Sequence, residues 1–386
     1  QLDLLFYVPA TVDYSADALA THQKALSQHW GTSINLFLCP QHTVDNSGPK
    51  WRRQFAPIFD FRAQGNFAIT RGTQQLETLE TCLERQPDAV FCHRLESMTP
   101  ILQTQQMLPP LFFDLDDVEH ISFARQIRQP PTRLVTKLYY FQIPALFWGE
   151  RRSIQTALRT FVCSQLDQQY LTEQWRLKGV VSVPNAVSIP EAQSICPEPT
   201  IMFLGGYYYY PNLNAANFLI EQIWPQIIKV RPDAKLIIAG THSENIRSYH
   251  SEIPGVEFTG FVENLDALYA RSRIVCCPIL SGGGTRVKII EAAAYGKPIV
   301  ATPIGAEGLS LVDGDDVLIK SSAQEIAMAC IDLLSNDYRC QCLGTAVHQK
   351  ASQHYDRANV IQLIQNHVQA ALETDLTVNV PSLATS

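Results

Sequence analysis

The 386-residue sequence lacks several features that would assign it to particular classes of protein. It has no excess of positive charge, since its formal net charge is −7, and this disfavours nucleic acid as a partner. It has no run of about 18 apolar residues, so we expect no membrane-spanning helix. It has no C-x-x-C pair among its ten cysteines, which disfavours a zinc site and is typical of a reducing, cytoplasmic setting. Because Gln1 opens directly into an apolar run, we expect no signal peptide ahead of it.

The sequence does contain enough apolar side chains for two hydrophobic cores. Hydrophobic residues make up 46% of it and charged residues only 17%, a composition typical of a soluble globular enzyme rather than a disordered chain. The length predicts two domains of ordinary size. Strand-like runs at 2–9 and 34–39 flank a helical pattern over 15–30, and this alternation predicts a parallel, doubly wound α/β sheet.

A proline-bearing segment over 189–199 indicates a linker, and we place the domain boundary just ahead of it. The predicted plan is, in chain order, a first domain over 1–185, a second over 186–352, a final helix over 353–372 and a disordered tail over 373–386. Within the first domain we also expect a polar loop over 41–65 and a short strand over 67–70.

The most informative stretch begins with three consecutive glycines, Gly282, Gly283 and Gly284. They follow an apolar run over 274–280 that is typical of a buried strand, and a short helical pattern follows them. A helix N-terminus presents free N–H groups and the positive end of the helix dipole, so it suits a phosphate. Glycines also let the backbone approach a ligand closely. The stretch therefore predicts an anion-binding turn, although sharp turns use glycine for conformational reasons alone.

Charged residues accompany this turn. Arg286 and Lys288 add positive charge, and Glu291 could accept hydrogen bonds from sugar hydroxyls. Two other phosphate motifs do not fit the spacing. A dinucleotide fingerprint requires glycine where Val287 stands, and a P-loop requires serine or threonine where Pro298 stands.

A second glycine turn follows the strand predicted over 200–204. Gly205 and Gly206 precede a helical pattern over 213–230, for which we expect Asn212 or a neighbour to be the N-cap. Such a strand–glycine–helix unit is the other place where a diphosphate can bind.

The segment GGGTRVKIIEAAAYGKPIVATPIGAEGL resembles the donor-sugar signature of GT-B glycosyltransferases of the retaining family 4 type. The resemblance implies two Rossmann-like doubly wound domains that face each other across a cleft, with the final helix crossing back to the first domain. It implies a nucleotide diphosphate sugar as donor and a glycan, a lipid-linked molecule or a small-molecule hydroxyl as acceptor. The family's Glu-x7-Glu pattern would place Glu291 on the ribose and its first glutamate at Gly283, so this chain departs from the pattern there.

The resemblance also implies a set of donor-binding residues. They are Gly205, Gly206, Gly282, Gly283, Gly284, Thr285, Glu291, Phe261 and Val262. Arg286 and Lys288 would stabilise the leaving diphosphate, so we expect no metal and no other cofactor.

The densest acidic cluster, Asp114-Leu115-Asp116-Asp117-Val118-Glu119-His120, follows another predicted strand. It has three interpretations: an acidic first turn of a helix, a divalent cation site on Asp114 and Asp116, or a catalytic or sugar-binding carboxylate. In the family a Thr-x-His-Asp-like motif usually stands here, and its histidine position aligns with Asp116. Asp116 is therefore the catalytic candidate. Arg94, which with His93 directly follows a strand over 88–92, joins Asp114 and His120 as acceptor-side candidates.

Residues 121–152 interleave basic and aromatic side chains. This pattern suits peripheral association with the inner face of a membrane, or a lipid-linked anionic acceptor. It is also typical of helices that pack on the core and leave their charges in solvent, and this second interpretation is the one we favour.

Other functions fit the same site. A nucleotide-sugar epimerase would use the cleft without an acceptor, a metal-dependent transferase would use Asp114 and Asp116 as ligands, and a non-catalytic sugar-nucleotide binding protein would hold the donor without turnover.

Overall fold

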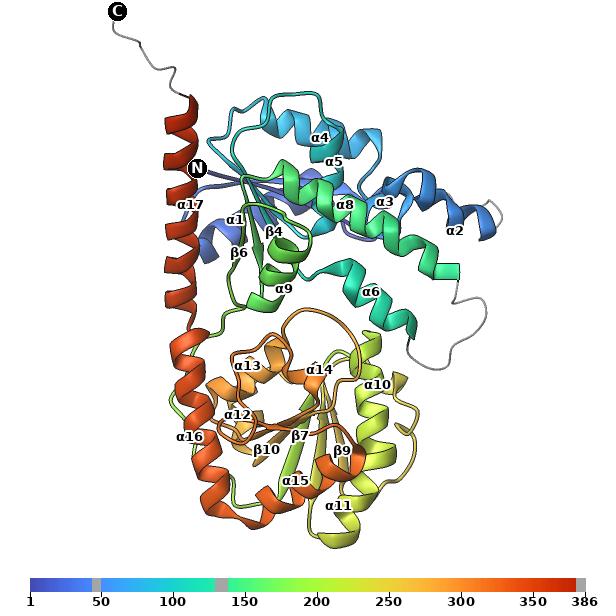
Figure 1. Ribbon diagram of the computed structural model, residues 1–386, viewed down its shortest axis with the longest axis vertical. Coiled ribbons are helices and arrows are strands. Elements are labelled where there is room, and N and C mark those ends of the chain that lie inside the picture. The colour runs from blue at the N-terminus through green and yellow to red at the C-terminus, as the bar shows by residue number, and fades with distance from the viewer. Residues whose placement is uncertain (44–49, 129–137, 380–386) are drawn as a thin grey trace, which may run out of the picture. The chain divides into compact units, whose positions relative to one another are not determined.

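The computed structural model describes residues 1–43, 50–128 and 138–379, and these form two compact units (Figure 1). The first unit comprises Gln1–Val162, Asp167–Ser182 and the chain from His367 onward. The second comprises Cys163–Leu166 and Val183–Asn366. The main passage between the units thus lies near residue 183, three residues from the predicted boundary. Within the described ranges, no helix has the length and apolarity needed to cross a membrane.

The first unit is built on parallel strands. Strands β1 (Leu2–Val8) and β2 (Ile34–Pro40) pair with each other, with Leu2 opposite Ile34. A four-stranded parallel sheet has the order β3 (Val90–His93), β4 (Leu111–Asp116), β5 (Arg159–Val162) and β6 (Val180–Ser182). The buried side chains of this unit include Phe67, Met98 and Phe113, all fully enclosed.

The helical segments of the first unit alternate with its strands. They are α1 (Ala16–Trp30), α2 (Lys50–Phe59), η1 (Phe61–Ala63), α3 (Gly65–Ala68), α4 (Thr73–Leu83), η2 (Leu95–Ser97), α5 (Met98–Gln103), α6 (Glu119–Arg128), η3 (Leu138–Gln142), α8 (Ile143–Thr156), α9 (Gln165–Gln169), η4 (Tyr170–Gln174) and α17 (Arg357–Asn379). Of these, α9 and α17 contribute residues to both units.

Two predictions for the first unit are wrong. The polar segment over 41–65 is not all loop, because it contains α2 and η1; Phe55 of α2 packs on Phe141 with ring centroids 5.3 Å apart. The segment over 67–70 is not a strand. The side chain of Gln64 accepts a hydrogen bond from the Asn66 N–H at 2.7 Å, which caps α3 and turns Phe67 into the core. A four-residue apolar run carries no period that separates a strand from a short helix.

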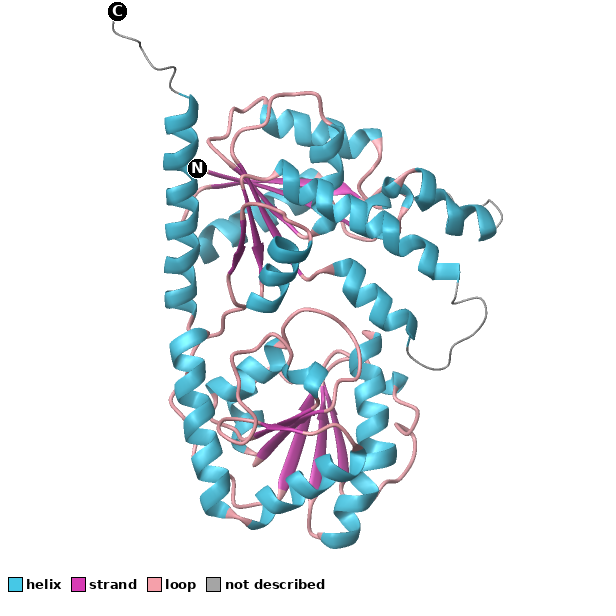
Figure 2. Cartoon of the chain, viewed as in Figure 1, coloured by secondary structure: helices cyan, strands magenta, loops and turns pink. Residues whose placement is uncertain are grey.

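The second unit holds a six-stranded parallel sheet with helices on both faces (Figure 2). The sheet order is β12 (Leu318–Ile319), β11 (Ile299–Ala301), β10 (Ile274–Cys277), β7 (Thr200–Leu204), β8 (Lys235–Ala239) and β9 (Val256–Gly260). The surrounding helical segments are α10 (Tyr210–Phe218), η5 (Leu219–Ile223), α11 (Trp224–Val230), η6 (Ser243–Asn245), α12 (Leu265–Ala270), α13 (Val287–Ala294), α14 (Pro303–Ala306), α15 (Ala323–Ser335) and α16 (Asp337–His354). Strands such as β7 and β10 are buried almost throughout, as expected for a sheet covered on both faces.

The order of the second sheet reverses between β7 and β10. The chain runs outward from β7 through β8 to β9, and then returns to place β10 on the other side of β7. In open parallel sheets ligands bind beyond the carboxyl ends of the strands at such a reversal. The turns that follow β7 and β10 are the two glycine turns of the sequence.

Two chain segments depart from their predicted limits. The helix after β7 begins at Tyr210, two residues before Asn212, and its N-cap Tyr209 makes no side-chain capping bond. The last helix, α17, continues to Asn379, so the predicted disorder is wrong over 373–379. The remainder of the predicted tail, 380–386, lies outside the described residues.

Candidate functional site

The two glycine turns of the second unit are joined by a lysine and an asparagine. Lys288 Nζ, from α13, donates a hydrogen bond of 2.6 Å to Asn212 Oδ1, and Asn212 Nδ2 donates one of 3.0 Å to the carbonyl oxygen of Gly206. A Cβ atom on Gly205 would lie 3.1 Å from Lys288 Nζ, closer than about nine in ten real contacts of that kind. The structure thus brings Gly205, Gly206 and Lys288 together. Asn212 links them instead of capping a helix.

The ammonium group of Lys288 lies in a poorly solvated place. It is 4.7 Å from the centroid of the Phe203 ring. The pKa of Lys288 is lowered to about 8, chiefly by burial and to a smaller extent by Arg286, while Cys277 and Glu291 oppose the shift. An anion bound beside this group would favour its charged form.

Arg286 is only partly satisfied by the protein. Its Nη1 donates to the carbonyl oxygens of Gly283 and, at 3.2 Å, Gly284. Its Nε and Nη2 are buried and have no hydrogen-bond partner among the described residues. Leaving buried donors unpaired costs free energy, so such groups call for a partner. A ligand with acceptor oxygens would supply one.

Gly282 gives the turn its shape. Its φ of +110° is a conformation that L side chains rarely adopt, and a Cβ atom there would meet Arg286 Nη2 at 3.2 Å and Tyr209 Oη at 3.4 Å. Glycine at this position therefore keeps the guanidinium group close to the backbone of the turn.

The turn is anchored on its other side by Thr285. The Thr285 hydroxyl accepts a hydrogen bond of 3.0 Å from Asn185 Nδ2, and the backbone N–H of Thr285 donates one to Cys163 Sγ at 3.4 Å. The next residue, Arg286, is the N-cap of α13 and makes no side-chain capping bond. The first N–H groups of α13 therefore have no side-chain acceptor at the cap.

Glu291 lies one turn beyond Lys288 in α13. Its carboxyl group is partly buried, and burial raises its pKa while Lys288 opposes that rise. The carboxylate forms no hydrogen bond or ion pair with the described residues, so both oxygens can accept bonds from a ligand.

Phe261 and Val262 follow β9, two strands away from β7. Val262 packs against the core, whereas Phe261 is 75% exposed. No hydrogen bond links either residue to the glycine turns within the described ranges, so their predicted role in donor binding stays a prediction.

The first unit carries a separate group of charged side chains where β3 and β4 end. The register pairs His93 with Asp114, and His93 Nδ1 lies 2.7 Å from Asp114 Oδ2. Next to them, Arg94 Nη2 lies 3.4 Å from Asp116 Oδ2, and the Arg94 N–H donates to the carbonyl oxygen of Asp114 at 2.7 Å. Three predicted residues are thus brought together, and His93, which was not among the predicted site residues, joins them.

The backbone at this group is strained. Arg94 has a φ of +64° and Asp116 a φ of +62°, values that L side chains rarely adopt, and the register of β4 against β5 shifts between Asp114 and Asp116. Each such residue costs on the order of 1–3 kcal/mol, and residues of this kind concentrate at functional sites.

If Asp114 and Asp116 formed a divalent cation site, a third ligand would be needed, and the described residues provide none there. Each carboxylate is already paired with a basic side chain, Asp114 with His93 at the end of β3 and Asp116 with Arg94 directly after it. In the described ranges, no group of three or more histidine, cysteine, aspartate or glutamate residues is arranged to hold a metal ion.

His120 occupies a different environment from the other acceptor-side candidates. It is buried, its Nδ1 contacts Glu150 Oε2, and its Nε2 lies 2.8 Å from the Tyr170 hydroxyl. The His120 N–H also donates to Glu150 Oε1 at 3.3 Å. Both ring nitrogens are therefore engaged inside the protein, and His120 does not join the group at the ends of β3 and β4.

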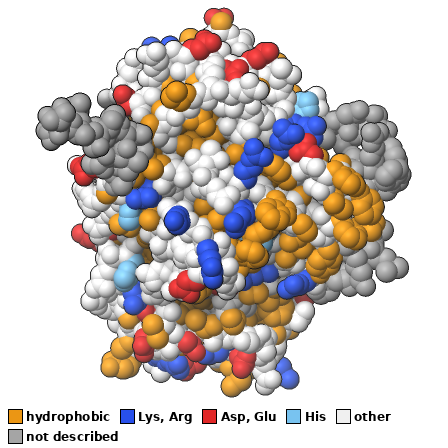
Figure 3. Space-filling view, turned by 45° about the horizontal axis from the view of Figure 1, so that its top comes forward, with side chains coloured by type: hydrophobic (Ala, Val, Ile, Leu, Met, Phe, Trp, Pro, Cys, Tyr) orange, Lys and Arg blue, Asp and Glu red, His pale blue; other side chains and the backbone are white. Residues whose placement is uncertain are grey.

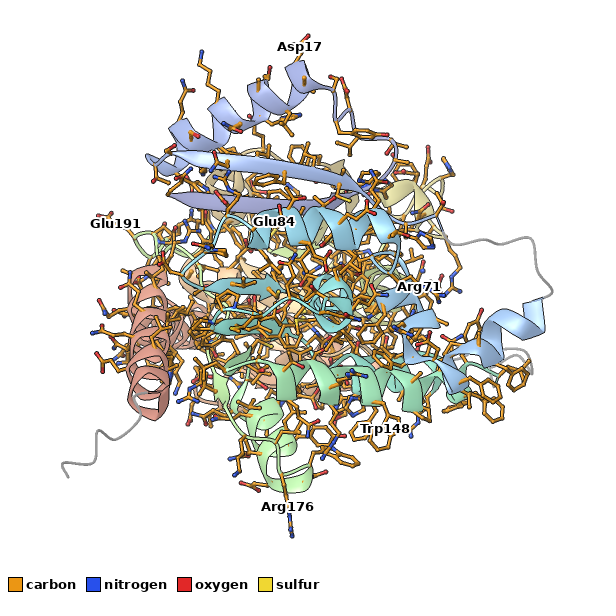
Figure 4. The ribbon with its side chains drawn as sticks, turned by 90° about the horizontal axis from the view of Figure 1, so that it is seen from above. Asp17, Arg71, Glu84, Trp148, Arg176 and Glu191 are labelled. Carbon is orange, nitrogen blue, oxygen red and sulfur yellow. The ribbon has the colours of Figure 1, made fainter. Side chains whose placement is uncertain are left out.

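The segment over 121–152 packs partly on the core and also leaves aromatic side chains exposed. Helix α8 buries Ala145, Leu146 and Ile154 in the core. Exposed aromatic side chains nevertheless remain on η3 and α8, and α2 adds two exposed apolar side chains: Tyr139, Tyr140, Phe141, Trp148, Ile58 and Phe59. Trp148 lies on the outer side of α8 (Figure 4) and is 59% exposed. Two of the basic residues in this segment, Arg133 and Lys137, lie outside the described residues.

Known proteins share both the sequence pattern and the fold. Residues 198–336 match the family model described as "Glycosyl transferases group 1". A phosphatidyl-myo-inositol mannosyltransferase of Mycolicibacterium smegmatis is 27% identical over 184 residues, which are 43% of this chain and 47% of that protein. The chain spans about half the length of the curated relatives it matches, 44% and 47% for two of them.

Two solved structures match nearly the whole chain. Sucrose-phosphate synthase from Thermosynechococcus elongatus has a TM-score of 0.66 at 14% identity, covering 96% of this chain and 98% of that one. The Anabaena protein HepE, crystallised with UDP-glucose, has a TM-score of 0.61 at 14% identity, covering 95% and 99%.

These similarities confirm the predicted resemblance to GT-B glycosyltransferases and the α/β fold class with parallel sheets. The individual roles of the site residues, and the cleft between the two domains, stay predictions.

Proposed function

We propose that this protein, whose fold is that of the GT-B glycosyltransferases, transfers a sugar from a nucleotide diphosphate sugar to a hydroxyl acceptor. The observation that carries the proposal is the pair of cationic side chains, Arg286 and Lys288, at the reversal of the second sheet. Arg286 has buried donors without partners, and Lys288 has a pKa lowered by burial. Both groups lie beside glycine turns and the uncapped N-terminus of α13.

The proposed chemistry requires stabilisation of a leaving diphosphate. Negative charge builds on that group as the bond to the sugar breaks, and preorganised donors stabilise it. Arg286, Lys288 and the first N–H groups of α13 are donors of this kind. They support a mechanism in which no metal ion is needed, because side chains supply the positive charge. Retention of anomeric configuration is proposed from the family resemblance.

Glu291 is proposed to bind the ribose. Its partly buried carboxylate has both oxygens available and lies one turn from Lys288 on the same helix. Vicinal hydroxyls can each donate one hydrogen bond to a carboxylate. Relatives support the donor class, since similar structures contain UDP and UDP-glucose and a matched relative is a mannosyltransferase.

The acceptor is proposed to be a glycan or a lipid-linked molecule bound by the first unit. The exposed aromatic residues of η3 and α8, with Ile58 and Phe59 of α2, support contact with a lipid surface. Basic side chains, Arg151 and Arg152, lie on the same helix as Trp148, and hydrophobic side chains gather beside basic ones on the face shown in Figure 3. Anionic headgroups attract such basic residues.

The lipid contact is tested by sedimentation with phosphatidylglycerol vesicles. We expect the chain to sediment with them and a Trp148→Ser/Phe59→Ser variant to stay in solution. Vesicles of phosphatidylcholine alone are the control, because they offer the same apolar interior without the charge. Equal sedimentation of variant and wild type would remove this surface from the proposal.

The transferase proposal is tested by nucleotide release from a panel of donors: UDP-glucose, UDP-N-acetylglucosamine and GDP-mannose. We expect one donor to release nucleotide, with or without an added acceptor, and EDTA to leave the rate unchanged. We expect Arg286→Ala to weaken binding of the corresponding nucleoside diphosphate by about 10- to 100-fold, as for loss of hydrogen bonds to a charged group. Loss of activity in EDTA would instead support a metal-dependent transferase.

Two rival functions give different results in the same assay. An epimerase would convert the nucleotide sugar into its isomer without releasing nucleotide. A binding protein would hold the donor and release nothing, even by hydrolysis. Neither outcome is compatible with the proposed transferase.

A further inference from the structure

The turn after β7 contains four consecutive tyrosines and no basic side chain. Tyr207–Tyr210 follow Gly205 and Gly206 directly, and the sequence from 205 to 228 includes neither lysine nor arginine. Besides the backbone N–H groups, the hydrogen-bond donors of this segment are therefore hydroxyls and side-chain amides. Whether a tyrosine hydroxyl serves a bound diphosphate depends on where each of the four side chains lies.

The four tyrosines take different positions. Tyr207 is fully buried, and its hydroxyl donates to backbone carbonyl oxygens of the core strands. Tyr208 is 73% exposed, and Tyr210 is the first residue of α10. Tyr209 reaches toward the other glycine turn, because a Cβ atom on Gly282 would lie 3.4 Å from the Tyr209 hydroxyl oxygen.

Tyr209 and Arg286 border the same space beside Gly282. The position that a Cβ atom would take there lies 3.4 Å from Tyr209 Oη and 3.2 Å from Arg286 Nη2. The φ of +110° at Gly282 is one that L side chains rarely adopt, so glycine keeps this space open. Arg286 Nη2 is also one of the buried donors without a partner among the described residues. An acceptor oxygen held beside Gly282 is therefore within reach of a guanidinium and a hydroxyl together.

The backbone of Tyr209 is held firmly in this place. Its N–H donates to the carbonyl oxygen of Gly206 at 3.2 Å, and its own carbonyl oxygen accepts from the N–H groups of Asn212 and Leu213 at 3.0 and 3.1 Å. A tyrosine side chain has only two rotatable torsions, so ordering it costs little entropy. The hydroxyl is thus a preorganised donor, the kind that stabilises developing negative charge.

A hydroxyl suits this position better than a third cation. A hydrogen bond from a neutral donor to an anionic oxygen is charge-assisted and about twice as strong as one between neutral groups. The pKa of Lys288 is already lowered to about 8, chiefly by burial and partly by Arg286. Another positive charge at the same turn would lower that pKa further and favour the loss of the lysine proton. A phenol adds a donor without this repulsion.

We propose that Tyr209 is a further donor-binding residue, whose hydroxyl donates a hydrogen bond to the same phosphate group that Arg286 binds. This inference rests on the transferase function proposed above, and it adds a contact from the first glycine turn to the phosphate held by the second. Because negative charge builds on the diphosphate as the sugar leaves, the hydrogen bond strengthens during the reaction.

The test compares Tyr209→Phe, which keeps the ring and removes the hydroxyl, with wild type. Calorimetry measures UDP and GDP affinity, and saturation-transfer NMR measures uridine and guanosine affinity. We expect the nucleoside diphosphate that wild type prefers to bind Tyr209→Phe about 10- to 100-fold more weakly. The corresponding nucleoside should bind both chains equally, because it carries no phosphate. Tyr208→Phe is the matched control, since the ring of the neighbouring Tyr208 meets His242 instead, with centroids 5.6 Å apart.

A double-mutant cycle tests whether one phosphate is shared. If Tyr209 and Arg286 bind the same group, the losses caused by Tyr209→Phe and Arg286→Ala are not independent. The double variant should then bind the nucleoside diphosphate more tightly, by about threefold or more, than the product of the two single losses predicts. Losses that simply multiply would overturn the shared phosphate.

The outcomes separate this inference from the proposed function. Nucleoside diphosphate affinity of Tyr209→Phe within about threefold of wild type, or an equal loss of nucleoside affinity, overturns the role of the hydroxyl and leaves the transferase in place. An equal loss in Tyr208→Phe overturns it as well. A wild-type chain that binds UDP or GDP with the expected dependence on Tyr209, yet releases nothing from any donor, overturns the transferase alone.

Discussion

Replacing Lys288 with methionine separates the stability of the second unit from its affinity for a diphosphate. Burial lowers the pKa of Lys288 from an ordinary 10.5 to about 8, so the folded chain disfavours the charged form. This difference corresponds to roughly 3 kcal/mol, at about 1.4 kcal/mol for each tenfold change in an equilibrium constant. Methionine removes that cost and keeps a flexible apolar side chain.

The substitution also has an opposing effect. It leaves Asn212 Oδ1 without its donor, which costs about 1–3 kcal/mol for a buried acceptor. The two effects nearly cancel. We therefore expect the ligand-free Lys288→Met chain to be as stable as wild type, or more stable by up to about 2 kcal/mol.

The pH dependence of this difference follows from the sign of the pKa shift. Below about pH 8 the lysine is charged in both the folded and the unfolded chain, so its destabilising effect is fully present. As pH rises from about 8 toward 10.5, the folded chain loses the proton first and the destabilising effect disappears. Urea unfolding of both chains at pH 6.5 and at pH 9.5 measures the change.

Binding of UDP should show the opposite preference. A diphosphate favours the charged ammonium, so wild type should take up as much as about half a proton on binding UDP at pH 8, close to the pKa of the free site. Calorimetry in two buffers of different ionisation enthalpy measures this uptake. We expect Lys288→Met to abolish it and to weaken UDP binding about 10- to 100-fold, as for loss of a charge-assisted hydrogen bond.

The control is Lys235→Met, which removes an exposed lysine at the start of β8 that pairs with Glu198 on the surface. It should change neither uptake nor affinity. The reasoning is refuted if Lys288→Met binds UDP as tightly as wild type, or if it takes up the same fraction of a proton.

Three further predictions concern single contacts. Glu291→Gln should weaken UDP binding about tenfold and abolish discrimination between UDP and its 2′,3′-dideoxy analogue, since a neutral amide accepts hydrogen bonds less strongly. Calorimetry with both ligands measures the two affinities. Retained discrimination would place the ribose elsewhere. Gly205→Ala should weaken UDP binding because its Cβ would lie 3.1 Å from both Lys288 Nζ and Asn212, whereas Gly65→Ala, with nothing within 4 Å, should not; equal affinities would contradict the close approach. Glu150→Gln should lower the free energy of unfolding, measured in urea, by about 1–3 kcal/mol, because it removes a charged acceptor from the buried His120 ring. It should leave UDP affinity unchanged. An unchanged midpoint of urea unfolding would mean that the carboxylate contributes nothing to stability.

The anion-binding turn could be predicted from sequence because all its parts are local. The glycines, Arg286 and Lys288 stand within seven residues of one another, directly between a strand pattern and a helix pattern. The neighbouring turn at Gly205 could be predicted for the same reason. The proximity of the two turns depends on the sheet order, which the alternation of strands and helices predicts only as a class.

Contacts between residues distant in sequence could not be predicted. Asn212 resembles a helix cap, but the helix begins earlier because Pro211 suits its first turn, and the amide then meets Lys288, 76 positions away. His93 finds Asp114 only once the register of β3 on β4 is known. His120 stands among polar residues in the sequence, which suggests exposure, yet it is buried and its ring contacts Glu150 from α8. In each case the role of the side chain depends on its partner, and the partner cannot be identified from the local sequence.

The last helix has a consequence for how the chain folds during synthesis. Residues of α17 from His367 onward belong to the first unit, where the His367 ring packs on Phe161 at 6.5 Å and Ala371 is fully buried. The first unit therefore stays incomplete until α17 has left the ribosome, although its strands are made before those of the second unit. The second unit has nearly all its residues between Val183 and Asn366, so it can close earlier. Contacts of such long sequence separation form slowly, which makes the amino-terminal half the later of the two to mature.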